Sequence, residues 1–133
     1  MGIFGGGKKD TRPVDEGLAH LRGSDENTAV EFWKKRLKLT ASVPDETARV
    51  GALTPQIREL TRVGEPERTR LTRARIIAFA QLTPEERQTL AAARRRAFDV
   101  DRAILEADQK LVDQILPTLD DKVRAAYPQP PPK

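Results

Sequence analysis

The residue type that offers most chemistry in this sequence is arginine. A guanidinium group binds phosphate oxygens through paired hydrogen bonds and keeps its charge at physiological pH. Arginines gather in two stretches, residues 68–75 and the triplet at residues 94–96. On an open helical surface they would contact the backbone of a nucleic acid. The candidate phosphate contacts are Arg68, Arg70, Arg73, Arg75, Arg94, Arg95 and Arg96.

Groups suited to catalysis are few. The chain has one histidine, His20, and no cysteine, which excludes thiol catalysis and disulfide bonds. No glycine-rich loop follows a predicted strand, so a phosphate cradle is not indicated. Asp101 and Asp108 lie seven residues apart on one predicted helix, too far to clamp one metal ion without carboxylates from a second helix. The sequence therefore predicts no enzyme, no metal site and no cofactor.

The element that positions the arginine triplet is a predicted helix over residues 83–116. Thr83, Pro84 and Glu86 form the pattern of a capping box with proline at the first helical position. No glycine or proline follows until Pro117, which ends a helix. At ~1.5 Å per residue such a helix is about 50 Å long. A helix of this length needs partners along its apolar sides.

Two apolar rows follow this helix, each with a spacing of seven residues. One row runs from Leu90 to Leu111 and the other from Ala91 to Val112. Charged residues separate the rows, which indicates two partners, either helices of this chain or, for one row, another molecule. The second row and the acids beside it form a candidate partner interface. Its residues are Phe98, Asp101, Leu105, Asp108 and Val112.

The charge of the predicted helix changes sign near its middle. Residues 81–98 hold four arginines against two glutamates, whereas residues 99–121 hold seven acidic against two basic residues. This order opposes the helix dipole, so it predicts a contact outside the helix. An antiparallel homodimer across Val100 would place each basic half against an acidic half. The alternative is intramolecular, with the basic residues 34–38 on the acidic half.

The rest of the chain is also predicted to be helical. Residues 27–40 form one helix with Trp33 in the core, and residues 66–81 form another that folds back on the long helix as a hairpin. Residues 44–50 and 54–63 read as two short helices around Gly51. Their spacing is a weak form of the DNA-binding helix-turn-helix, and a packing corner is the simpler interpretation.

Composition sets the class. The 133 residues suit one all-α domain, which we place at residues 24–126, and the net charge of +4 is too small to indicate nucleic acid by itself. Residues 1–23 read as a flexible leader and residues 127–133 as a disordered proline-rich tail. The leader also holds a candidate membrane-surface foot. Its residues are Ile3, Phe4, Lys8 and Lys9.

We therefore expect a non-enzymatic adaptor or structural subunit that acts through helix-mediated protein–protein contacts, as a homodimer or in a larger assembly. The alternatives are a nucleic-acid-associated protein that uses its arginine-rich helices, and a peripheral membrane-surface scaffold held by the leader. No apolar run approaches the ~20 residues of a membrane span and no signal-peptide core begins the chain. The expected location is the cytoplasm, with the membrane surface as the alternative.

Overall fold

The computed structural model describes residues 18–131, and this part of the chain is helical without a strand. The prediction of an all-α domain is confirmed. The candidate membrane foot and most of the predicted leader fall in residues 1–17, outside the described residues, as do residues 132–133 of the predicted tail. The α-helices are α2 (Glu26–Ser42), α3 (Glu46–Arg62), α4 (Glu67–Ala80), α5 (Pro84–Val100), α6 (Arg102–Ile115) and α7 (Asp121–Ala126), with the 3₁₀ turns η2 (Ala19–Leu21) and η3 (Leu116–Thr118).

Side-chain caps fix where most of these helices begin. Aspartates accept a hydrogen bond from the third residue of α2, α3, α6 and α7, which satisfies a backbone N–H that has no partner within the helix. The predicted capping box of α5 is confirmed. Thr83 Oγ1 accepts from Glu86 N at 3.1 Å, and Glu86 Oε1 accepts from Thr83 N at 2.9 Å.

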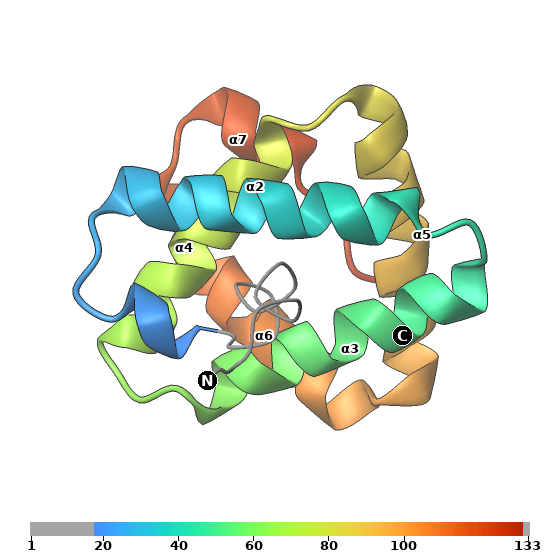
Figure 1. Ribbon diagram of the computed structural model, residues 1–133, viewed down its shortest axis with the longest axis horizontal. Helices are drawn as coiled ribbons and strands as arrows, with labels where there is room; N and C mark the ends of the chain where they lie inside the picture. The colour runs from blue at the N-terminus through green and yellow to red at the C-terminus, as the bar shows by residue number, and fades with distance from the viewer. Residues whose placement is uncertain (1–17, 132–133) are drawn as a thin grey trace, which may run out of the picture.

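The helices cross one another, and α6 contacts three of the others. In Figure 1, α2 crosses in front of α4, and α6 lies behind α3. α2 packs mainly against α4, α3 packs mainly against α5, and α6 contacts α3, α4 and α5. The short helix α7 lies against α4 and carries the end of the described chain to the core.

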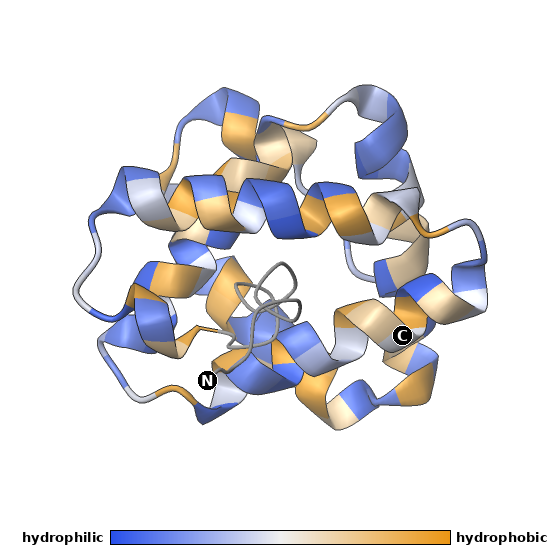
Figure 2. Cartoon of the chain, in the orientation of Figure 1, coloured by the Kyte–Doolittle hydropathy of each residue, from blue (hydrophilic) through white to orange (hydrophobic). Residues whose placement is uncertain are grey.

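Hydrophobic and hydrophilic residues alternate along the long helices, as Figure 2 shows, and α6 separates them onto different sides most clearly. The buried residues form two clusters. The larger one surrounds Trp33, which is fully buried, as predicted. The smaller one lies between α3, α5 and α6 and includes Ile57, Phe98 and Leu105. Helices α3, α5 and α6 contribute residues to both clusters.

The prediction of one long helix over residues 83–116 is wrong, because the chain breaks at Asp101. This residue has φ −148° and ψ 75°, outside the helical region, and separates α5 from α6. Its Oδ1 accepts a hydrogen bond from Ile104 N, and its Oδ2 pairs with Arg58 of α3 at 3.1 Å. The side chain therefore starts a new helix and ties the corner to α3. A helix cap without glycine or proline is enough to end the run.

The break also changes which helices form the hairpin. α4 and α5 do not pack along their lengths, contrary to the prediction, and α6 instead folds back against α5. Folding back buries most of both apolar rows within this chain. Burial of apolar surface favours this arrangement over a long helix whose second row would need another molecule.

The two short helices predicted around Gly51 are one helix, α3, with Pro55 inside it. Proline removes one helical hydrogen bond, but Val50, Leu53 and Ile57 on one face are buried against α5 and α6. Packing of this face outweighs the missing bond. The helix-turn-helix interpretation therefore has no structural counterpart in the described residues.

The predicted tail boundaries also need correction. Leu18 and Leu21, assigned to the flexible leader, are buried, and the N–H of Leu18 donates to Glu59 Oε2 at 2.8 Å. Tyr127, assigned to the disordered tail, is 7% exposed. In both places the apolar side chain that packs into the core is an isolated residue in a polar stretch, which composition alone does not reveal.

Candidate functional site: two arginines on a buried aspartate

The most concentrated chemistry in the described chain is centred on Asp108 of α6. Its side chain is 2% exposed, and Arg75 of α4 binds it with both terminal nitrogens. Arg75 Nη1 donates to Oδ1 at 2.9 Å and Nη2 donates to Oδ2 at 2.8 Å. This is the bidentate geometry that makes arginine–carboxylate pairs strong. The pair joins α4 to α6 across the core.

Arg94 of α5 is a second cation on the same carboxylate. Its Nη1 lies 2.9 Å from Asp108 Oδ2, and its Nη2 donates to Gln109 Oε1 at 3.0 Å. Gln109 in turn donates to Asp113 Oδ1, an exposed carboxylate, at 2.9 Å. Two buried guanidiniums therefore share one buried carboxylate, which leaves one excess positive charge in the core.

Burial and charge act in opposite directions on Asp108. Burial alone would raise the pKa of its carboxyl group, but Arg75 and Arg94 outweigh this effect and hold the pKa below its ordinary value. Burial likewise lowers the pKa of Arg75, whereas the contacts with Asp108 and Tyr127 raise it above the ordinary arginine value. Both groups are therefore charged throughout the physiological pH range.

Tyr127, the first residue after α7, completes the cluster. Its hydroxyl oxygen accepts from Arg75 Nη2 at 3.0 Å. Its ring meets the edge of Phe79 at a centroid distance of 5.4 Å, and the guanidinium of Arg94 lies 5.5 Å from its centroid. Arg94 also lies 5.7 Å from the centroid of Phe98, so its cation contacts two aromatic rings.

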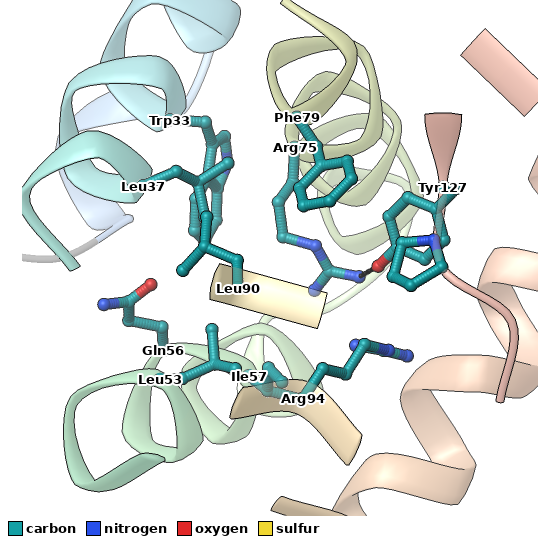
Figure 3. A pocket seen from close by; sticks show the side chains of 11 residues that line it. Trp33, Leu37, Leu53, Gln56, Ile57, Arg75, Phe79, Leu90, Arg94 and Tyr127 are labelled. Atoms are coloured by element: carbon teal, nitrogen blue, oxygen red, sulfur yellow. Dashed lines mark hydrogen bonds between the residues drawn. The ribbon is translucent and has the colours of Figure 1, made fainter. Parts of the chain in front are cut away.

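A cavity of about 30 Å³ lies beside this cluster, between α2, α3, α4 and α5. Figure 3 shows Trp33 and Leu90 around the same space as Arg75, with Tyr127 on one side. The volume is enough for one or two water molecules. Three buried polar atoms on lining residues lack a hydrogen-bond partner within the described chain: Trp33 Nε1, Gln56 Oε1 and Arg94 Nε.

The structure does not gather the seven candidate phosphate contacts on one surface. Arg75 and Arg94 are buried on Asp108. Arg70 donates to the backbone oxygens of Ser24 and Leu21, and its partner in the same helix is Glu67. The others are placed apart: Arg68 is half-buried, Arg73 pairs with Glu26, Arg96 pairs with Glu46, and Arg95 is exposed.

The candidate partner interface is placed inside the fold. Phe98, Leu105, Asp108 and Val112 are each at most 3% exposed, and only Asp101 is half-buried. The second apolar row therefore faces helices of this chain, which was the alternative left open by the sequence. The antiparallel dimer across Val100 was predicted from a continuous helix, whereas α5 ends at Asp101.

Sequence reasoning missed Tyr127 and Gln109 as members of the cluster. Tyr127 was read as tail because prolines follow it, and Gln109 carries no signal of its own. Arg75 and Asp108 left a weak signal, because each is a charged residue next to positions that are apolar. A charged residue on the buried side of a helix indicates a paired ion.

Other groupings in the described residues do not form a comparable site. Among residues 18–131, no three histidine, aspartate or glutamate side chains are placed to hold a metal ion. None of the helices described is long and apolar enough to cross a bilayer. Comparison with known proteins gives no family model, no curated protein and no solved structure that matches the chain. A functional assignment therefore rests on the residues of this site.

Proposed function

We propose that this chain is a non-enzymatic adaptor or structural subunit that works through protein–protein contact, and that its helices bind an extended aromatic–proline segment. One observation carries the proposal. The segment after α7 lies in a site built by α4 and α5, with the ring and hydroxyl of Tyr127 each contacted by a buried arginine. Pro128 follows it along the cavity.

The charge state of the site favours binding over catalysis. Arg75 has its pKa raised and Asp108 has its pKa lowered, so neither group exchanges protons near neutral pH. General acid–base catalysis requires a group whose pKa lies near the operating pH. A fixed pair of cations on one carboxylate is suited to holding a ligand in one orientation.

The contacts also define what kind of segment fits. Phe79 and Arg94 contact an aromatic ring, and Arg75 donates to an oxygen at the end of that ring. A proline after the aromatic residue keeps the backbone extended, which lowers the entropy lost on binding. The partner that fits is a polypeptide with a Tyr-Pro segment, and the chain's own residues 127–128 have this sequence.

The test is binding of such a segment in trans to the full-length chain. Tyr127→Ala vacates the site, and the probe is a synthetic peptide with the sequence of residues 124–131. Trp33 is the only tryptophan and lines the cavity, so its fluorescence reports occupancy. We expect saturable binding to Tyr127→Ala and binding about tenfold or more weaker to wild type, where the chain's own segment competes.

Two controls make the test specific. A peptide in which alanine replaces the tyrosine should bind Tyr127→Ala much more weakly, because it lacks both the ring and the hydroxyl. Circular dichroism must show that Tyr127→Ala keeps the helical content of wild type. If Tyr127→Ala is folded and neither peptide changes its Trp33 fluorescence more than buffer does, the proposed function is overturned.

A further inference from the structure

The arginine–aspartate cluster in the core has an excess positive charge, and this excess indicates that a ligand of the cluster would be an anion. Arg75 and Arg94 carry two positive charges, and Asp108 carries one negative charge. All three side chains are at most 8% exposed. A further acid, Asp113, is exposed and is linked to the cluster through Gln109. One negative charge beside the arginines would neutralise the cluster.

The oxygen on Arg75 is not the best acceptor for that position. Tyr127 presents a neutral phenol to a charged guanidinium at 3.0 Å. A carboxylate at the same place would form a charge-assisted hydrogen bond, roughly twice as strong as one between neutral groups. The phenol therefore marks the position of an acceptor without supplying the charge that the cluster lacks.

The surroundings of Tyr127 describe the rest of the ligand. Its ring lies between the edge of Phe79 and the cation of Arg94, a place that suits any six-membered aromatic ring. The cavity next to it is lined by Trp33, whose buried Nε1 has no hydrogen-bond partner in the described residues. This N–H is a further donor on a residue that lines the cavity, as is Nε of Arg94.

From this geometry we propose that the Arg75–Arg94 cluster and its cavity form a binding site for a small aryl carboxylate with one negative charge. The aromatic ring takes the place of the Tyr127 ring, and the carboxylate takes the place of its hydroxyl on Arg75. The vacated side chain provides the ligand's main volume, and the cavity of about 30 Å³ provides room for the second carboxylate oxygen. Tyr127 is then a resident pseudo-ligand that closes the site when no acid is present.

This inference uses the site of the proposed peptide contact, and it rests on that proposal only in requiring that Tyr127 can leave. The two ligands differ in charge, because the Tyr-Pro segment offers a neutral phenol and the aryl acid offers an anion. A site that prefers the anion has a second role, binding of a small molecule. The peptide and the acid should then compete, since both need the position beside Arg75.

The experiment compares phenylacetate with phenylacetamide, which has the same shape and no charge. Both are titrated into full-length wild type and into Tyr127→Ala, with Trp33 fluorescence as the readout. We expect phenylacetate to bind Tyr127→Ala with a dissociation constant on the order of 1 mM or below. Wild type should bind it about tenfold or more weakly, because only the fraction with Tyr127 displaced is competent. Phenylacetamide should bind Tyr127→Ala about tenfold or more weakly than phenylacetate.

Two further variants secure the interpretation. Tyr127→Leu keeps apolar bulk while removing the ring and the hydroxyl, so it serves if Tyr127→Ala does not fold, and we expect an affinity between those of wild type and Tyr127→Ala. Arg95→Gln, made in the Tyr127→Ala chain, removes an exposed arginine next to Arg94 and should leave phenylacetate binding unchanged. A loss in Arg95→Gln would indicate surface binding and would overturn the site.

The outcomes separate this inference from the proposed function. Binding of the 124–131 peptide without any preference for phenylacetate over phenylacetamide would leave the peptide contact standing and overturn the acid site. Binding of phenylacetate without binding of the peptide would leave the acid site standing and overturn the peptide contact. Failure of folded Tyr127→Ala and Tyr127→Leu chains to bind phenylacetate at roughly 10 mM would also overturn the acid site.

Discussion

Arg75 and Asp108 form a bidentate ion pair that joins α4 to α6, with both side chains at most 5% exposed. The desolvation of these charges is costly and offsets much of their mutual attraction. Removing one member, however, leaves a buried charge without its partner. The pair is therefore a sensitive point of the fold.

We expect Asp108→Asn to lower the free energy of unfolding by about 3–5 kcal/mol, because two buried guanidiniums lose their common counter-ion. Urea denaturation followed by Trp33 fluorescence measures the change. Asp99→Asn is the matched control, since the Asp99 side chain is 74% exposed and should change the free energy by no more than about 0.5 kcal/mol. A loss below about 1 kcal/mol in Asp108→Asn would contradict the buried cluster.

Stability should also fall in acid. The pKa of Asp108 is lower in the folded state than the unfolded value of ~3.9, so the folded chain binds fewer protons. Its contribution is fully present above about pH 4 and is lost as the pH falls through the folded-state pKa. Urea denaturation from pH 6 to pH 2 should show a plateau and then a decrease below about pH 4.

Other carboxylates share this behaviour, so the comparison with Asp108→Asn is needed. Asp25, Glu67 and Glu86 also have lowered pKa values, the first and last chiefly through a backbone N–H and Glu67 chiefly through Arg70. They remain in the variant. We therefore expect the variant to lose less stability than wild type over the same acid range. If the free energy of unfolding falls in parallel with pH in both proteins, Asp108 is not the source of the acid destabilisation.

The sequence was informative where a local signal determines the structure. The capping pattern of Thr83 and Glu86 specified the start of α5, and the apolar environment of Trp33 specified its burial. The sequence was not informative where a contact between distant residues determines the structure. Asp101 ends α5 because its side chain caps α6 and binds Arg58, forty-three residues away in sequence. The site itself depends on Arg75, Asp108 and Tyr127, which only the folded chain brings together.

The corner at Asp101 gives a third prediction. Asp101→Ala removes the cap on Ile104 N and the pair with Arg58, so the free energy of unfolding should fall by about 1–2 kcal/mol. The N–H of Ile104 has no helical partner to replace the carboxylate. Amide hydrogen exchange at Ile104 should therefore become faster, whereas Asp99→Ala should leave it unchanged. Unaltered exchange and stability in Asp101→Ala would mean that the cap does not form the corner.

The last prediction concerns Leu105, which the sequence placed on an interface and the structure places in the core, where it is fully buried. Leu105→Asp puts an unpaired charge among Ile57, Phe98 and their neighbours, and the variant should lose cooperative unfolding or more than about 4 kcal/mol. Val100→Asp is the comparison, because Val100 lies in the same corner and is 67% exposed. It should change the free energy of unfolding by no more than about 0.5 kcal/mol. Circular dichroism measures whether the Leu105→Asp chain keeps its fold, and light scattering measures its association state. A variant that keeps its fold and changes only its association state would show that Leu105 lies at an interface and not in the core.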